Sequence, residues 1–233
     1  MLYQLEKLKG TVLNFFFPQW CVGCGREGEL ICGYCLQSLS RIVPPLCPQC
    51  GKPQSNNILC SSCVNWQGEI AGIRSPYIFT GVIRQAIHEL KYKNLRALAV
   101  PLANLLRDYI IDNPIPAEVL VPVPLHKSRL RERGYNQSNL LACELGKLVN
   151  LPVVDNCLLR QRHNPPQART LSINERLSNV RDAFYCPDNS LSGRKILLID
   201  DVATSGATLD ACAAVLKVAG VLSVWGLVLA REI

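Results

Sequence analysis

The feature that most constrains this chain is a set of eight cysteines, arranged as four Cys-x-x-Cys pairs between residues 21 and 63. Pairs followed by glycine alternate with pairs that are not, so the segment is a tandem repeat. The apolar stretch 15–17 is too short for a secretion signal, so we expect these pairs to bind metal rather than to form disulfides. Four thiolates without histidine favour a structural Zn²⁺ ion.

The alternation predicts that consecutive pairs share an ion, so that one or two Zn²⁺ are bound. The predicted ligands are Cys21, Cys24, Cys32 and Cys35 for one ion, and Cys47, Cys50, Cys60 and Cys63 for the other. Interleaved pairing, a single occupied site and an iron–sulfur cluster remain open alternatives. Residues 23–28 also spell Gly-x-Gly-x-x-Gly, but no strand precedes them, so they do not indicate a dinucleotide site.

The length of 233 residues and the 48% hydrophobic content predict one globular core with a small appendage. We expect an amphipathic helix within residues 1–19, a double zinc ribbon over 20–66 and a larger domain over 70–233. In the ribbon, metal replaces a core that is too small to form by itself. A docking platform for nucleic acid or protein is the functional alternative.

The chain is basic, with a formal charge of +7. With eight cysteines ionised and two Zn²⁺ bound, this charge falls by four, to +3, which weakens any argument for nucleic-acid binding from net charge. The local basic cluster at 126–133 remains. No run of about 18 apolar residues exists, so we expect a cytoplasmic protein without membrane insertion. The oligomeric state is not set by the sequence.

Beyond residue 70, apolar segments alternate with amphipathic ones, which predicts an α/β domain. Segments 196–199 and 225–229 are apolar throughout, as in strands of a parallel sheet covered by helices on both faces. We predict strands over 73–79, 119–123, near 153, 195–199 and 224–229. The predicted helices cover 82–92, 96–111, 136–149, 174–180 and 208–219.

Residues 200–208 follow one of these strands, where parallel sheets bind their ligands. Two acids there can accept hydrogen bonds from a diol or hold a divalent ion, and the small, hydroxyl-rich residues after them lead into a helix N-terminus. This combination suits a sugar that carries a phosphate, whereas helix capping needs only one such group. The predicted ligand-binding residues are Asp200, Asp201, Ala203, Thr204, Ser205, Gly206, Ala207 and Thr208.

Segment 196–209 resembles the 5-phosphoribosyl-1-pyrophosphate (PRPP) signature of type I phosphoribosyltransferases, with an apolar run, Asp-Asp, small residues and Ser-Gly-x-Thr. The segment Val-Pro-Val-Pro-Leu-His at 121–126, the arginine-rich stretch after it and the double cysteine module resemble the ComF family. The resemblance implies a type I phosphoribosyltransferase fold, a mostly parallel sheet flanked by helices, behind an N-terminal zinc-ribbon module. It also implies a role in DNA uptake during natural competence or, for GntX-like members, in less defined metabolism.

The same resemblance implies that Asp200 and Asp201 are the catalytic acids, which hold the ribose hydroxyls and Mg²⁺, and that residues 203–208 hold the 5-phosphate. Residues expected near the pyrophosphate are Lys91, Val123, Pro124, His126, Arg129 and Arg133. Lys91 has an alternative role as a helix-end cation, and the arginines as a solvated basic loop. Thr204 stands where enzymes for 6-oxopurines carry aspartate, so we do not expect hypoxanthine or guanine as the acceptor.

Three hypotheses for function remain. The first is Mg²⁺-dependent phosphoribosyl transfer from PRPP to an unidentified acceptor. The second is a non-catalytic PRPP-binding protein whose ribbon docks single-stranded DNA or a DNA-uptake helicase-like partner. The third is a zinc-ribbon nucleic-acid binder whose C-terminal domain is only a scaffold.

Overall fold

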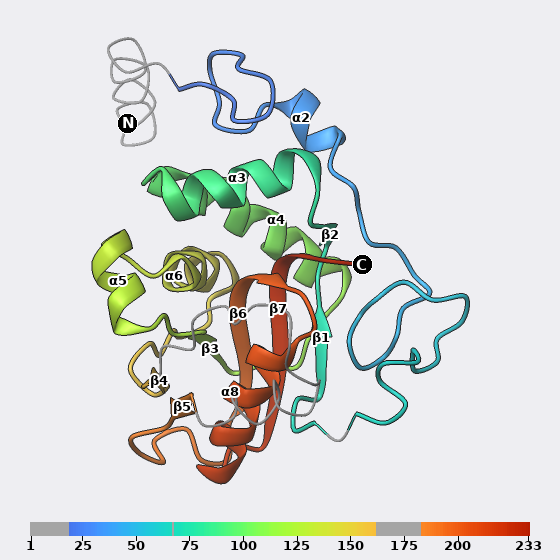
Figure 1. Ribbon diagram of the computed structural model, residues 1–233, viewed down its shortest axis with the longest axis vertical. Helices are drawn as coiled ribbons and strands as arrows, with labels where there is room; N and C mark the ends of the chain where they lie inside the picture. The colour runs from blue at the N-terminus through green and yellow to red at the C-terminus, as the bar shows by residue number, and fades with distance from the viewer. Residues whose placement is uncertain (1–18, 67, 162–182) are drawn as a thin grey trace, which may run out of the picture.

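The structure is a computed structural model that describes residues 19–66, 68–161 and 183–233 (Figure 1). The predicted N-terminal helix, apart from residue 19, and the predicted helix over 174–180 lie outside these residues. No helix in the described ranges has the length and apolar character needed to cross a membrane.

A parallel sheet forms the centre of the larger domain (Figure 1). Within the described residues its strands are β1 (Gly72–Arg74), β2 (Tyr77–Ile78), β3 (Val119–Pro122), β6 (Lys195–Ala203) and β7 (Ser223–Arg231). The order is β1-β7-β6-β3, β2 also pairs with β7, and all these pairings are parallel. The predicted strand over 73–79 is two short strands, because Pro76 lies between them and has no N–H to donate.

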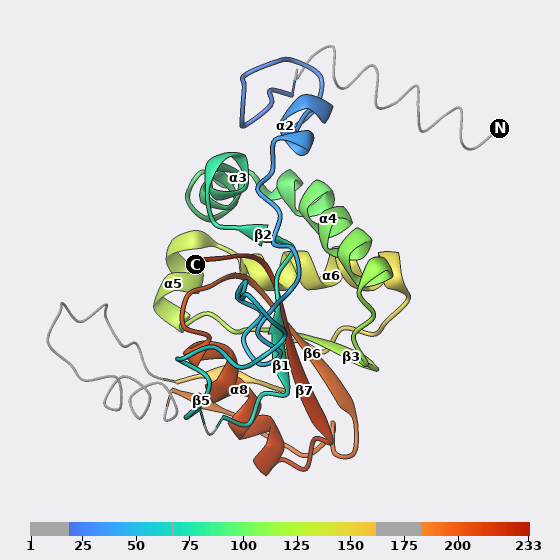
Figure 2. The same ribbon diagram turned by 90° about the vertical axis from the view of Figure 1, so that its right-hand side faces the viewer.

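The two faces of the sheet are covered by different helices (Figure 2). Leu197 and Ile199 of β6 belong to a core shared with α3 (Gly81–Tyr92), α4 (Ala99–Asp112) and α6 (Gln137–Val149). The alternate residues Ile196 and Leu198 pack with α8 (Ala207–Val218) on the other face. This arrangement confirms the predicted α/β architecture, in which strands buried on both faces are apolar throughout.

The predicted helices over 82–92, 136–149 and 208–219 are confirmed as α3, α6 and α8, with ends that differ by a residue. The predicted helix over 96–111 is a 3₁₀ turn, η1 (Arg96–Leu98), followed by α4. The strand expected near residue 153 is a single bridge between Val153 and Leu120. An antiparallel pair, β4 (Leu159–Arg160) with β5 (Phe184–Tyr185), was not predicted.

Helix α5 (Lys127–Arg133) was not predicted either, because it has no buried residue and therefore no apolar periodicity. His126 caps its N-terminus by accepting a hydrogen bond from Ser128 N, and Gly134 ends it in the left-handed conformation. The basic cluster of the sequence is thus a helix.

The cysteine-rich segment packs directly on this domain. Its short helix α2 (Gly33–Gln37) contributes Cys35 to the same core as Ile83 of α3. Further along, Ile73 N of β1 donates a hydrogen bond to Gln49 O, inside the third cysteine pair. Metal binding in this segment is therefore linked by packing to α3 and to the sheet edge.

Candidate metal centres and ligand site

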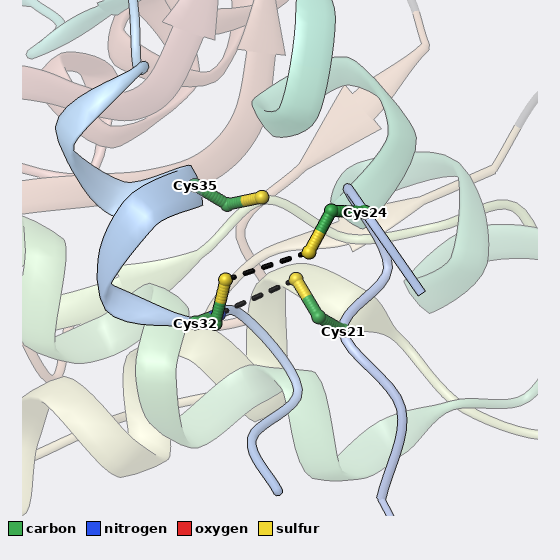
Figure 3. Close-up of side chains that lie close together, drawn as sticks. All are labelled: Cys21, Cys24, Cys32 and Cys35. Carbon is green, nitrogen blue, oxygen red and sulfur yellow. Dashed lines mark hydrogen bonds between the residues drawn. The ribbon is translucent and has the colours of Figure 1, made fainter. Parts of the chain in front are cut away.

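The first four cysteines form one compact cluster, which we call site 1 (Figure 3). The sulfur atoms of Cys21, Cys24, Cys32 and Cys35 all lie within 4.8 Å of one another and face a common centre. Cys32 N donates to Cys21 Sγ at 3.3 Å, and Gly25, at φ +72°, donates its N–H to Cys21 O at 2.8 Å. This geometry is that of a zinc knuckle, in which glycine permits the tight turn.

The last four cysteines form site 2, with the same local geometry. The sulfur atoms of Cys47, Cys50, Cys60 and Cys63 lie within 4.8 Å of one another, and all four residues are buried. Cys60 N donates to Cys47 Sγ at 3.5 Å, and Gly51, at φ +71°, donates to Cys47 O at 2.9 Å. The grouping confirms sequential ligation, since no interleaved set of cysteines gathers within the described residues.

The acidity of the thiols shows why a cation fits. Burial raises the pKa of Cys21, but the N–H groups of Cys32, Cys24 and Gly23 outweigh it and lower this pKa to about 6. Burial and the neighbouring thiols raise the pKa of Cys35 to about 12. Four crowded thiols therefore cannot all ionise without a positive charge between them. Closed sets of four thiolates fit structural Zn²⁺.

The two predicted acids lie at the carboxyl end of β6, within the strand rather than after it. Asp201 is 2% exposed, and its Oδ1 forms an ion pair with Lys91 Nζ at 2.6 Å. Asp200 Oδ1 accepts hydrogen bonds from Ser138 Oγ at 2.8 Å and from Asp201 N at 2.9 Å. Lys91 and Ser138 come from α3 and α6, so three elements position the acid pair.

Burial and the nearby Asp201 charge raise the pKa of Asp200 to about 7, against the opposing effect of Lys91 and its hydrogen bonds. Asp201 Oδ2 has no hydrogen-bond partner among the described residues. An unsatisfied buried carboxylate oxygen is costly, and a hydroxyl or a cation would satisfy it. The pair therefore fits a diol or a divalent ion.

The β6–α8 loop, residues 204–206, joins the acid pair to a helix N-terminus. Thr204 and Ser205 are exposed, and Ser205 Oγ accepts a hydrogen bond from Ala207 N at 3.3 Å. Gly206 has φ +86° and no side chain that caps α8. The exposed hydroxyls and the N–H groups of the first helical turn can bind an anion such as phosphate.

A basic cavity of about 380 Å³ lies beside Lys91. Its lining residues are Lys91, Tyr92, Asn94, Arg129, Glu132, Arg133 and Tyr135. Three of the residues predicted to bind pyrophosphate, Lys91, Arg129 and Arg133, therefore line the same cavity.

The other three predicted pyrophosphate residues lie elsewhere. Val123 is buried, and its carbonyl accepts a hydrogen bond from Asn136 Nδ2. Pro124 lines a separate cavity that includes Asp155 and Arg160. His126 caps α5. Sequence reasoning also missed Ser138, because a serine inside a helix carries no signal of a partner 62 residues away.

Comparisons with known proteins agree with this description of the molecule. Residues 12–64 match the double zinc ribbon domain family. The chain is 31% identical to competence protein F of Haemophilus influenzae over 93% of its own length and 99% of that protein. It is 30% identical to competence protein ComFC of Bacillus subtilis, over 79% and 76% respectively. Identity to the DNA utilization protein YhgH of Escherichia coli K12 is 28%, over 84% and 88%.

Solved structures are more distant. The glutamine PRPP amidotransferase of B. subtilis superposes with a TM-score of 0.39 at 19% identity, over 55% of this chain and only 26% of its own. A purine phosphoribosyltransferase from Pyrococcus horikoshii gives a TM-score of 0.35 at 14% identity, over 56% and 71%. Scores this low carry no functional argument.

A parallel sheet with helices on both faces and an acid pair followed by a hydroxyl-bearing loop at its carboxyl edge defines the class: a type I phosphoribosyltransferase fold. Two four-cysteine zinc sites precede this fold in the sequence. The relatives identify the family, since they match most of the chain at about the same identity. The chain belongs to the ComF family.

Proposed function

We propose that this protein binds PRPP together with Mg²⁺ at the carboxyl end of β6. The observation that carries the proposal is the continuity of three features: the acid pair, the β6–α8 loop and the basic cavity beside Lys91. Each matches one part of the ligand, namely the ribose hydroxyls, the 5-phosphate and the pyrophosphate. A helix cap or a lone acidic cluster would account for only one of them.

Different residues of the chain would bind different parts of the ligand. Asp200 and Asp201 accept hydrogen bonds from the ribose hydroxyls, and the N–H groups at the start of α8 hold the 5-phosphate. Mg²⁺, when bound, offsets the charge of the pyrophosphate. Arg129 and Arg133 line the cavity that receives the pyrophosphate, and their charges favour its departure from C1.

Lys91 makes a contact beyond the two roles expected for it. It pairs with Asp201 and also lines the basic cavity, with 21% of its side chain exposed. A pyrophosphate in the cavity would compete with Asp201 for this ammonium group. Lys91 would then turn from the acid to the ligand, which leaves Asp201 free to accept from the ribose.

Calorimetry with PRPP and Mg²⁺ tests the binding proposal. Wild-type protein should bind, and Asp200→Ala and Asp201→Ala should each weaken binding at least about tenfold, because each removes a charged hydrogen-bond acceptor. Asp108→Ala is the matched control, since Asp108 is an exposed acid on α4 that pairs with Arg107. Unchanged affinity in both site variants would defeat the assignment.

We propose that the biological role is DNA uptake, a proposal supported by relatives that are named competence proteins and a DNA utilization protein. In a naturally competent host that lacks its own ComF-family gene, the wild-type chain should restore transformation and Asp201→Ala should not. Release of pyrophosphate across a broad acceptor screen separates an enzyme from a binding protein. Release at background with every acceptor would leave the non-catalytic hypothesis.

A further inference from the structure

Arg231, the last residue of β7, is buried in an unusual way. Its side chain is completely inaccessible to solvent, and Nη2 donates a hydrogen bond to Thr204 O at 3.2 Å. Its Nε and Nη1 atoms have no hydrogen-bond partner in the described part of the chain. No carboxylate there forms an ion pair with it. A buried guanidinium without a counter-charge is strongly unfavourable.

Site 2 supplies the missing negative charge. Burial lowers the pKa of Arg231, whereas Cys50, Cys63, Cys60 and Cys47 act on it in the opposite direction. A Zn²⁺ ion held by four thiolates has a net charge of about −2. Arg231 therefore interacts electrostatically with an anionic cluster and donates a hydrogen bond to the carbonyl of Thr204, in the β6–α8 loop.

The same loop touches site 2 through Gly206. A Cβ atom at Gly206 would lie 2.5 Å from Ile73 Cδ1 and 3.1 Å from Trp66 Cη2, so the loop packs tightly against these two side chains. Trp66 packs on the four cysteines of site 2, and its backbone N–H donates to Cys63 O at 3.1 Å. Ile73 N is bonded to Gln49 O between two of the ligands. Two packing routes, through Trp66 and through Ile73, thus join the loop to site 2.

We propose that Arg231 is a positioning residue that joins the zinc ion of site 2 to the β6–α8 loop, so that this ion sets the conformation in which the loop binds phosphate. Arg231 acts through Thr204 and does not touch the ligand. Its relevance to ligand affinity rests on the proposed PRPP site, whereas the mechanical link between site 2 and the loop does not. Site 1 has no such residue among those described here.

The test uses zinc-loaded, full-length protein and compares Arg231→Met with Arg74→Met. Arg74 is the matched control: it also interacts electrostatically with Cys47 and Cys50, but it bonds to Pro48 O and not to the loop. Hydrogen exchange of peptides that cover 203–208 reports on the loop without any ligand. Zinc release to a chelator reports on site 2, and calorimetry with PRPP and Mg²⁺ reports on affinity.

In Arg231→Met we expect faster exchange at 203–208, zinc release from one site faster by about 10- to 100-fold, and PRPP affinity lower by at least about tenfold. Arg231→Lys, which keeps the charge, should recover most of the zinc retention. Arg74→Met should leave exchange at 203–208 and PRPP affinity unchanged. If Arg231→Met does not fold, stepwise removal of zinc from wild-type protein should produce the same faster exchange only when the second ion, that of site 2, is lost.

The outcomes separate the two proposals. Exchange and zinc release that match wild type in Arg231→Met overturn the link, as does loss of site 2 zinc without faster exchange at 203–208. Absence of PRPP binding by wild-type protein overturns the proposed function alone. Exchange that quickens equally in Arg74→Met would reduce Arg231 to a general stabilising residue and would also overturn the inference.

Discussion

Site 1 and site 2 are almost the same locally, but they lie in different surroundings. In both, a glycine near φ +70° closes the knuckle, and two sulfur atoms lie 3.6 Å apart in site 1 and 3.7 Å apart in site 2. Cys24 of site 1 is exposed, whereas all four ligands of site 2 are buried. Site 1 packs against α3, and site 2 packs against β1 beside Arg231. The two copies of the motif therefore differ in the elements that surround them, and we expect them to differ in role.

The largest expected effect is a difference in stability between variants of the second cysteine of each site, Cys50 and Cys24. Cys50→Ser removes a fully buried ligand, so we expect loss of the site 2 ion and destabilisation on the order of 5 kcal/mol. Cys24→Ser removes an exposed ligand, for which water can substitute, and should cost clearly less. Elemental analysis, expected to give about two zinc ions in wild type, and thermal unfolding measure both changes. Equal destabilisation would remove the distinction between the sites.

The knuckle glycines offer a second matched pair. Both have positive φ, so alanine at either position costs about 1–2 kcal/mol. At Gly25 the new Cβ meets nothing within 4 Å, but at Gly51 it would lie 2.4 Å from Ile73 O, which is backbone and cannot easily move. Gly51→Ala should therefore cost about 3 kcal/mol in denaturant unfolding. A Gly25→Ala variant that is as unstable would contradict the close packing of site 2 on β1.

A smaller effect is the pH dependence of stability, which we attribute to the acid pair and not to either zinc site. The pKa of Asp200 is raised to about 7, above its value in the unfolded chain, so the folded state binds the extra proton. Stability should therefore fall as pH rises through this interval, by about 2 kcal/mol between pH 5 and pH 7. Asp200→Asn should lose this pH dependence while it keeps both zinc ions. If the curves of stability against pH are parallel for wild type and variant, the pKa of Asp200 is not raised.

The smallest effect is chemical reactivity, which need not change stability. Cys24 is the exposed ligand of site 1, so under a chelator and an alkylating agent it should be modified before any cysteine of site 2. Mass spectrometry of partly modified protein measures the order. Modification of Cys47 or Cys63 first would show that burial does not protect site 2.

Local patterns predicted much of this molecule. The sequential grouping of the cysteines was predicted from the tandem repeat, with interleaved pairing left open, and the observed groups match it. The apolar run 196–199 was correctly placed in a buried parallel strand. The strand is longer than predicted, however, because its hydrogen bonds to β7 continue through Asp200 to Ala203. Polar residues in a strand give no periodic signal.

What the sequence did not predict depends on contacts between distant segments. Lys91 pairs with Asp201 because α3 crosses the end of β6, and nothing near residue 91 indicates this. Arg231 was not among the predicted site residues, yet among the described residues it is the largest fully buried side chain. Its place depends on how site 2 folds against the sheet. Residues whose roles depend on such distant contacts cannot be found from spacing or composition.

The most direct test of the central claim is a crystal structure of the zinc-loaded protein with PRPP and Mg²⁺. We predict that the 5-phosphate lies against the β6–α8 loop and the first turn of α8, and that Asp200 and Asp201 bind the ribose hydroxyls. Lys91 should have moved from Asp201 toward the pyrophosphate. Ligand bound away from this edge of the sheet, with the pair of Lys91 and Asp201 intact, would contradict the account.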